Sequence, residues 1–284
     1  MPNRFFKISL LVAWIGTMAW LVRFEAYPEH FEQTISGYRG LFGDEMGVRE
    51  QWMKIYLAGQ PIGYTQTILD VDDKSPDAAY ELTTNASINI PGFGGDGNRR
   101  FRISGDVRFD GSYRVQSFGV AATDGKMRFV ARGKRLERDL FEVEHGLKDA
   151  LSTTTVRIPD DAIVQSPQFD LILKRLRPGQ HLWLKVMDPL TMSPSRMKIA
   201  AKEYEIITLN SGRRVTALRL EVTQQSGPIN AWVDQQGQML RQETPFGLTL
   251  ETCTAQEALT LDETPSGLNL QKLLTDGLFK VFQR

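Results

Sequence analysis

The sequence is poor in the residues that usually carry chemistry: it has one cysteine, Cys253, and three histidines. A single cysteine excludes an internal disulfide and any metal site built from several thiolates. Neither charge is in excess, because Lys plus Arg and Asp plus Glu both number 34. The chain as a whole therefore lacks the strongly basic character of nucleic-acid-binding proteins. We expect no nucleic-acid partner, no bound metal and no cofactor.

Long apolar runs are also scarce, and the one that stands out is Ile8–Val22, fifteen residues without a charge, preceded by Arg4 and Lys7. Two interpretations compete: a cleaved signal peptide, or an uncleaved signal anchor near the lower length limit of about 17 residues for a spanning helix. The run is followed by Arg23 and bulky residues rather than by small ones. We therefore predict a transmembrane signal anchor over residues 1–23, in the inner (cytoplasmic) membrane. The N-terminus is then cytoplasmic, and the rest of the chain is extracytoplasmic (periplasmic).

Residues 24–50 are predicted to connect the anchor to the rest of the chain. Aromatic and aliphatic side chains recur there at intervals of three or four, which is a helical stripe, although several glycines interrupt it. We predict a juxtamembrane amphipathic helix. It either packs under its own domain or lies on the bilayer surface.

After residue 50 the pattern changes to a period of two. The stretch Asn230–Glu251 alternates apolar and polar residues around a turn at Gln236-Gly237, as expected of antiparallel strands with one buried face. Comparable segments recur along the chain. Strands are predicted at about 52–57, 62–69, 79–90, 99–109, 113–123, 126–133, 136–144, 152–158, 181–187, 196–209, 213–224, 229–235, 238–243 and 247–254.

Glycine-containing pairs mark the turns between several of these strands: Asp110-Gly111, Asp124-Gly125 and Gly133-Lys134. A short helix is predicted over Gln168–Leu176, after a Ser-Pro start and before a Pro-Gly stop. A second helix is predicted in the tail, Ser266–Arg284, where leucines form a stripe. This tail helix either covers the concave side of the sheet or offers its apolar face to a partner or membrane.

Together these patterns predict a mainly β fold: a large curved antiparallel sheet with a short internal helix and a C-terminal helix, after one N-terminal transmembrane helix. The domain limits are 51–260 for the antiparallel β-domain and 261–284 for the C-terminal amphipathic helix.

Three segments carry a family resemblance: Gln51–Tyr64, Leu176–Ser193 and Ala231–Leu259. They resemble the β-rich region that precedes the catalytic domain in bacterial transglutaminase-like membrane proteins. They are also similar to periplasmic domains with the half-barrel shape of lipoprotein carriers. The resemblance implies a curved sheet whose concave apolar surface could hold an acyl chain or a peptide. Only about 25 residues follow Leu259, too few for that catalytic domain, so the resemblance does not imply the family's activity here.

Cys253 is a candidate nucleophile only with a histidine and an acid beside it, because a nucleophilic thiolate needs a neighbouring base. One hypothesis combines Cys253 with His181 and Asp188 in a hydrolase or transferase. Cys253 lies in a predicted strand, without a helix N-terminus to lower its pKa, so a half-buried structural cysteine is the favoured interpretation. The acidic residues around 70–81 lack the ligand and glycine positions of a calcium loop.

Loops and charge clusters contain the candidate binding residues. A glycine-rich loop at 91–98 precedes several arginines, and strands rather than a helix flank it, which favours a loop or lid over a phosphate site. The densest basic cluster, 126–138, is followed by acidic residues up to Glu144, which favours cross-strand ion pairs over contact with anionic lipid. The candidate contacts to a partner or to lipid are Phe93, Arg99, Arg100, Lys126, Arg128, Leu274, Leu278 and Phe282.

The function expected from these observations is that of a non-enzymatic, membrane-anchored accessory or scaffold subunit of a bacterial envelope complex, bound to other envelope proteins. The alternative is a carrier module that binds lipid or lipoprotein through the concave apolar face of the sheet.

Overall fold

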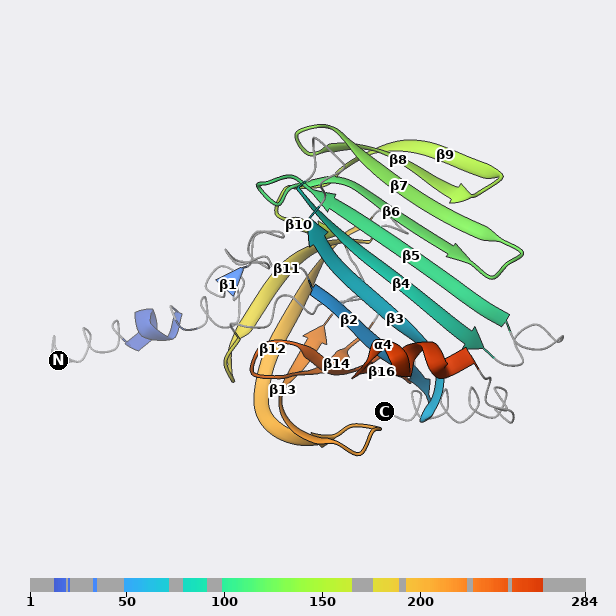
Figure 1. Cartoon of the computed structure of the whole chain (residues 1–284). Helices are drawn as coiled ribbons and strands as arrows, with labels where there is room; N and C mark the ends of the chain where they lie inside the picture. Colours follow the sequence, from blue (N-terminus) through green and yellow to red (C-terminus); the bar gives the residue numbers. More distant parts are fainter. Residues whose placement is uncertain are drawn as a thin grey trace, which may run out of the picture.

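The computed structural model describes residues 13–18, 20, 33–34, 49–71, 79–90, 99–164, 176–188, 193–223, 227–244 and 247–262. Most of them lie in strands of one sixteen-stranded sheet (Figure 1). The first nine strands are β1 (Gln33–Thr34), β2 (Arg49–Leu57), β3 (Gln60–Val71), β4 (Tyr80–Ile90), β5 (Arg99–Phe109), β6 (Val115–Thr123), β7 (Arg128–Glu137), β8 (Leu140–Leu147) and β9 (Ala150–Arg157). The others are β10 (Ala162–Val164), β11 (His181–Asp188), β12 (Ser193–Thr208), β13 (Arg214–Thr223), β14 (Ile229–Val233), β15 (Met239–Glu243) and β16 (Leu248–Cys253).

The strands follow the order β1-β11-β12-β13-β14-β15-β16-β2-β3-β4-β5-β6-β7-β8-β9, and β10 pairs with β11 beside this path. Neighbours are antiparallel, except that β1 and β10 run parallel to β11. Two runs of hairpins are therefore joined where β16 pairs with β2, Cys253 opposite Trp52. In Figure 1 strands β2 to β9 form a broad twisted layer, and β11 to β13 curve round to its other side.

The sheet's apolar face is covered by the other half of the same sheet. Side chains from both runs of hairpins belong to one buried cluster, among them Phe109, Phe141, Leu182, Met197 and Leu220. Each of these side chains is at most 1% exposed. Because each half covers the other, the curved sheet supplies both walls of its own core.

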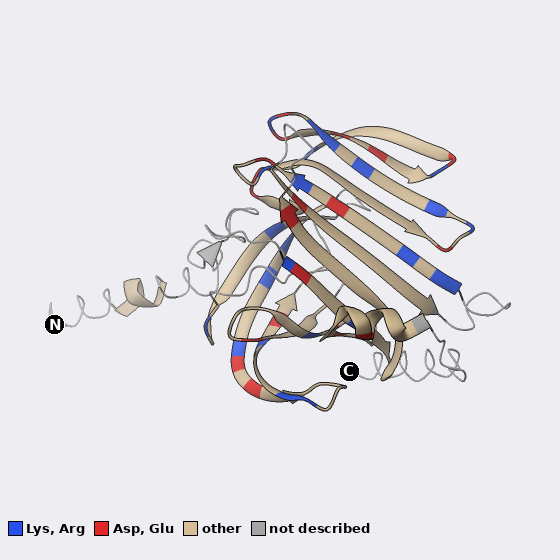
Figure 2. Ribbon diagram, viewed as in Figure 1, with Lys and Arg blue, Asp and Glu red and all other residues tan. Residues whose placement is uncertain are grey.

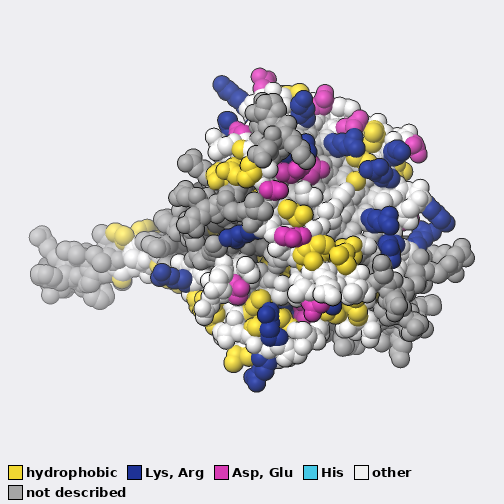
Figure 3. All heavy atoms as spheres, in the orientation of Figure 1, with side chains coloured by type: hydrophobic (Ala, Val, Ile, Leu, Met, Phe, Trp, Pro, Cys, Tyr) yellow, Lys and Arg dark blue, Asp and Glu magenta, His cyan; other side chains and the backbone are white. Residues whose placement is uncertain are grey.

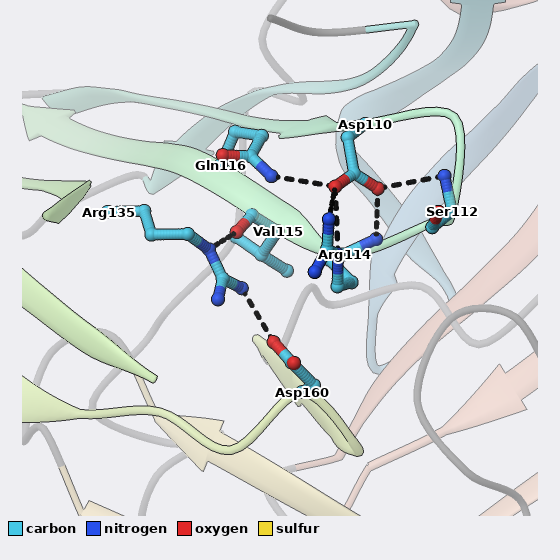
Figure 4. Close-up of polar contacts among 7 residues, drawn as sticks. All are labelled: Asp110, Ser112, Arg114, Val115, Gln116, Arg135 and Asp160. Carbon is cyan, nitrogen blue, oxygen red and sulfur yellow. Dashed lines mark hydrogen bonds and ion pairs between the residues drawn. The ribbon is translucent and has the colours of Figure 1, made fainter. Parts of the chain in front are cut away.

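A short crossover closes this arrangement where β9 leads into β10. Ile158, just after β9, is buried, and its N–H donates to the carbonyl of Asp139 at 2.7 Å. The guanidinium of Arg135 on β7 donates to the carbonyl oxygen of Val115 at 2.6 Å and pairs with Asp160 at 2.9 Å (Figure 4). Asp161 pairs with Lys185 on β11. The crossover is thereby pinned to both halves of the sheet.

The sequence patterns predicted the strands of the β-domain well, but one turn is wrong. Gly133-Lys134 was expected to end a strand, whereas β7 continues to Glu137 and turns at Arg138–Asp139. The reason is a close contact: a Cβ on Gly133 would lie 2.1 Å from Cε1 of the Phe118 ring on the neighbouring strand. Gly133 makes room for a buried aromatic ring in mid-strand, so it does not mark a turn.

Two short elements, β10 and the helix α4 (Ala255–Leu259), were not predicted. Thr254 caps α4 through a reciprocal capping box with Glu257, and the 3-10 helix η3 (Thr260–Asp262) follows. The spacing Thr254-x-x-Glu257 is the sequence signal of this capping box, but the predicted strand 247–254 took in Thr254 as its last residue.

Two predicted helices lie outside the described residues. One is the C-terminal helix Ser266–Arg284, and the other is the internal helix Gln168–Leu176, of which only Leu176 is described; this residue is buried and not helical. Of the connector before Arg49, the described residues Gln33–Thr34 form a strand where a helix was expected. Of the predicted anchor, residues 13–18 and 20 are described, and they are helical. Within the described part of the chain, no helix is long and apolar enough to cross a membrane.

The contact at Gly133 gives a test of the core. Gly133→Ala is expected to destabilise the protein by about 1–3 kcal/mol, because the Phe118 ring is buried and cannot move aside without strain. The measurement is the urea midpoint of the full-length protein in detergent micelles. Gly105→Ala is the matched control, since its Cβ would make an ordinary 3.6 Å contact. Equal midpoints for the two variants would contradict the packing described.

Candidate functional site

Among the described residues, a hollow of about 960 Å³ lies on the outer face of β5 to β9. Most of its lining belongs to two rows of residues that stand directly opposite one another across the strands. One row is Asp106, Gly119, Arg132, Glu144 and Thr153, and the other is Arg108, Ser117, Lys134 and Glu142. We call this feature the outer groove.

The groove exists because β6 carries small side chains on its outer face. Ser117 and Gly119 lie between Asp106 and Arg108 on one side and longer cationic side chains on the other. Figure 2 shows the contrast, with Lys and Arg along β5 and β7 and β6 uncharged between them. The walls therefore bear charged groups, and the floor exposes small side chains and backbone.

The charges across the groove are arranged in opposite pairs. The register sets Arg132 opposite Glu144 and Lys134 opposite Glu142, as the alternation in the basic cluster predicted. Arg108 pairs with Glu81 on β4 at 3.0 Å. Arg135, grouped with these cations on sequence grounds, instead stacks over the ring of buried Phe141, 4.8 Å from its centroid. Because successive residues point to opposite faces of a strand, the side chain of Arg135 lies on the other face from that of Lys134.

Asp106 is a titratable group whose pKa is shifted by this setting. Burial raises the pKa of its carboxyl group above the ordinary value, and Glu81 adds to the shift while Arg108 and Arg132 oppose it. Its carboxylate lies against Gly119, where a Cβ would come within 2.6 Å of Oδ1. A larger side chain at 119 would push this carboxylate out of place, so the small floor residue and the acid fit together.

Four of the sequence-predicted contact residues lie at one end of the strands, namely Arg99 and Arg100 at the start of β5 and Lys126 and Arg128 around the β6–β7 turn. Arg99 pairs with Asp124 at 3.0 Å. Backbone N–H groups of Met127 and Lys126 hold the pKa of Asp124 below its usual range, and Arg99 adds to this. Arg100, Lys126 and Arg128 are exposed. Figure 3 shows Lys and Arg side chains gathered over this part of the molecule. Phe93, Leu274, Leu278 and Phe282 lie outside the described residues.

A second polar cluster, not anticipated from the sequence, lies on the outer face of β12 to β16. Glu251, whose side chain is 3% exposed, pairs with Arg241 and accepts a hydrogen bond from the N–H of Asn210 at 2.7 Å. Arg241 also donates to the carbonyl of Thr208 at 2.7 Å and lies over the ring of Trp232. The cluster fastens the turn between β12 and β13 to the centre of the sheet.

The combination of His181, Asp188 and Cys253 as catalytic residues is wrong on geometric grounds. His181 begins β11 and Asp188 ends it. At about 3.3 Å per residue the two lie roughly 23 Å apart along the strand, and an odd separation of seven puts them on opposite faces. Burial raises the pKa of the Cys253 thiol to about 11; the charge of Lys54 opposes this shift, and the charge of Glu257 adds to it more weakly. Across the described ranges, no three His, Cys, Asp or Glu side chains are grouped as metal ligands.

The groove itself was missed in the sequence, although its charges were noticed. The sequence signal of the groove floor is the alternate positions of β6 that face outward, where Ser117, Gly119, Ala121 and Thr123 are all small. These residues become a floor only when β6 is known to lie between β5 and β7.

The pKa of Cys253 predicts its reactivity. At pH 8 alkylation by iodoacetamide is expected to be roughly two orders of magnitude slower in the folded protein than in the urea-unfolded chain, since little thiolate is present. The rate should keep rising with pH towards about 11, as the folded thiol deprotonates. A rate that levels off near pH 8.5 would contradict the burial described.

The Arg241–Glu251 pair predicts a large stability effect. Glu251→Ala is expected to cost about 3–5 kcal/mol, because it leaves the Arg241 guanidinium, 18% exposed, without its carboxylate. The free energy of unfolding is measured by urea titration in detergent. Glu243→Ala, on the same strand as Arg241, is the control and should change stability by less than about 1 kcal/mol. Similar losses for both variants would show that the pair is not what stabilises this region.

Comparison with known proteins yields little. No family model matches the sequence, and no curated protein matches it. The resemblance to transglutaminase-like membrane proteins therefore stays a prediction. Among solved structures, a DUF1089 family protein from Pseudomonas aeruginosa matches with a TM-score of 0.33 and 13% identity, over 62% of this chain and 87% of that one. A likeness this weak carries no argument about fold or function.

Proposed function

We propose that the chain is a non-enzymatic accessory or scaffold subunit of a bacterial envelope complex, anchored in the inner membrane with its β-domain outside the cytoplasm. In this proposal the outer groove is the surface that binds another envelope protein. The observation that carries it is the groove itself: an open hollow of about 960 Å³, with charged walls from β5, β7 and β8 and a floor of small residues.

The shape and charge of the groove suit an extended polypeptide. Its walls present guanidinium, ammonium and carboxylate groups on neighbouring strands, and its floor admits a chain close to the sheet. Such mixed, complementary charges give specificity and steer encounter, while partly solvated pairs add modest affinity. An extended partner segment could pair its own charged side chains with both walls.

The anchoring part of the proposal is supported by the described N-terminal residues. They are helical, and their large apolar side chains are exposed: Trp14 and Trp20 are each 57% exposed and Ile15 is 53% exposed. Exposed apolar side chains of this size need an apolar cover. A bilayer would provide it for the whole run from Ile8 to Val22.

The alternative, a lipid carrier, is less well supported by the described strands. Carriage requires free volume along the concave apolar face. That face is instead the core of the protein, and Phe109, Phe141 and Val143 are fully buried in it. The outer groove, which is polar, does not suit an acyl chain.

Site-specific photo-cross-linking in cells tests the proposal. Benzoylphenylalanine at the groove position Ser117 is expected to form an adduct with a discrete envelope protein. The same probe at Ser211, in the exposed turn between β12 and β13, is the control and should not. Arg132→Gln with Lys134→Gln should lower the adduct yield up to about tenfold, because in this proposal the two cations pair with carboxylates of the partner.

The membrane topology is tested in the same cells by alkaline carbonate extraction and by protease treatment of spheroplasts. The chain should stay with the membrane and be cleaved from outside. The proposal is wrong if the chain is released by carbonate, or if positions 117 and 211 give the same adducts.

A further inference from the structure

The β6–β7 and β8–β9 hairpins end side by side at one end of the sheet. The N–H of Lys148, in the second turn, donates to the carbonyl of Arg128 at 2.8 Å, and Leu147 stands opposite Phe129. Arg102 on β5 lies in the same row as Arg128, with Thr123 between them. We call this end the tip surface; it consists of Arg102, Lys126, Met127, Arg128, Leu147, Lys148 and Leu151.

Three large apolar side chains are exposed on the tip surface. Met127 is 60% exposed, Leu147 is 49% exposed and Leu151 is 41% exposed. Met127 lies at a turn, and Leu147 and Leu151 flank the next one. These side chains do not contribute to the core. Exposed apolar side chains that cluster at projecting turns indicate a contact surface.

Cations are adjacent to these apolar residues in the chain: Lys126 and Arg128 flank Met127, and Lys148 follows Leu147. Arg102, Lys126, Arg128 and Lys148 are all exposed. The carboxylate of Asp124, in the first of the two turns, is already engaged by Arg99 and by the backbone N–H groups of its own turn. Asp149 is then the remaining described acid in these two turns, so positive charge dominates.

We propose that the tip surface docks on an anionic lipid bilayer. Met127, Leu147 and Leu151 enter the headgroup region, and the surrounding Lys and Arg side chains pair with lipid phosphates. Long cationic side chains can extend to the phosphates while their aliphatic stems stay beside the apolar groups. The projecting turns carry apolar and cationic side chains together, which fits a flat lipid surface. An extended protein segment fits the groove instead. This inference does not depend on the groove or its partner.

The test uses the full-length protein with Cys253→Ser, so that one introduced cysteine carries an environment-sensitive nitrobenzoxadiazole label. Met127→Cys places the label at the tip. Leu136→Cys is the matched control, because Leu136 is a similarly exposed apolar residue (55%) near the far end of β7, the strand that begins directly after Met127. Each protein is reconstituted into phosphatidylcholine vesicles with or without phosphatidylglycerol.

The label at position 127 is expected to shift its emission to shorter wavelength in the anionic vesicles only. The label at 136 should not respond. Lys126→Gln with Arg128→Gln should weaken docking roughly tenfold or more, as should high salt. The apolar N-terminal segment is present in every sample, so it cannot cause these differences.

Two results would overturn the inference. One is an emission at position 127 that is the same in both kinds of vesicle or matches that at 136. The other is a shift at 127 that requires an added envelope protein, which would make the tip a protein interface.

Discussion

Burial of the sheet's apolar face by the opposite half of the same sheet is the interaction on which the structure depends. The described helices, apart from the N-terminal one, are the short α4 and η3, so the described domain has no helical layer to cover that face. The sheet must curve until Phe141 from one half and Leu184 from the other share a core. Arg135 and Asp160 hold the crossover where the two halves meet. Polar and charged residues are consequently left to the outer face, where the groove lies.

The strands were predictable because each depends on local alternation and on a nearby turn. Asp124-Gly125 is an example of a turn read correctly from two residues. What the sequence could not show was contact between distant segments. The pairing of β16 with β2 and the parallel pairing of β10 with β11 have no local signal. Gly133 was misjudged for the same reason, since its role depends on a ring from another strand.

In the candidate site, too, the features that depend on local sequence were predictable and those that depend on strand order were not. The charges of Arg132 and Lys134 and the acids that face them were recognised from composition and alternation. The floor formed by Ser117 and Gly119 required the order of three strands. Catalysis by Cys253 was doubted from its strand setting, and burial gives the physical reason, since a pKa of about 11 keeps the thiol protonated.

The pairing of β2 with β16 also matters for how the protein is made. The two strands are separated by nearly the whole β-domain, so β2 leaves the ribosome long before its partner exists. At synthesis rates of about 5–20 residues per second, that interval is on the order of 10–40 seconds. During it β2 can pair with β3 but keeps one open edge, which is prone to wrong pairing. Completion of the domain therefore waits for its last strand, and the nascent chain needs protection from aggregation until then.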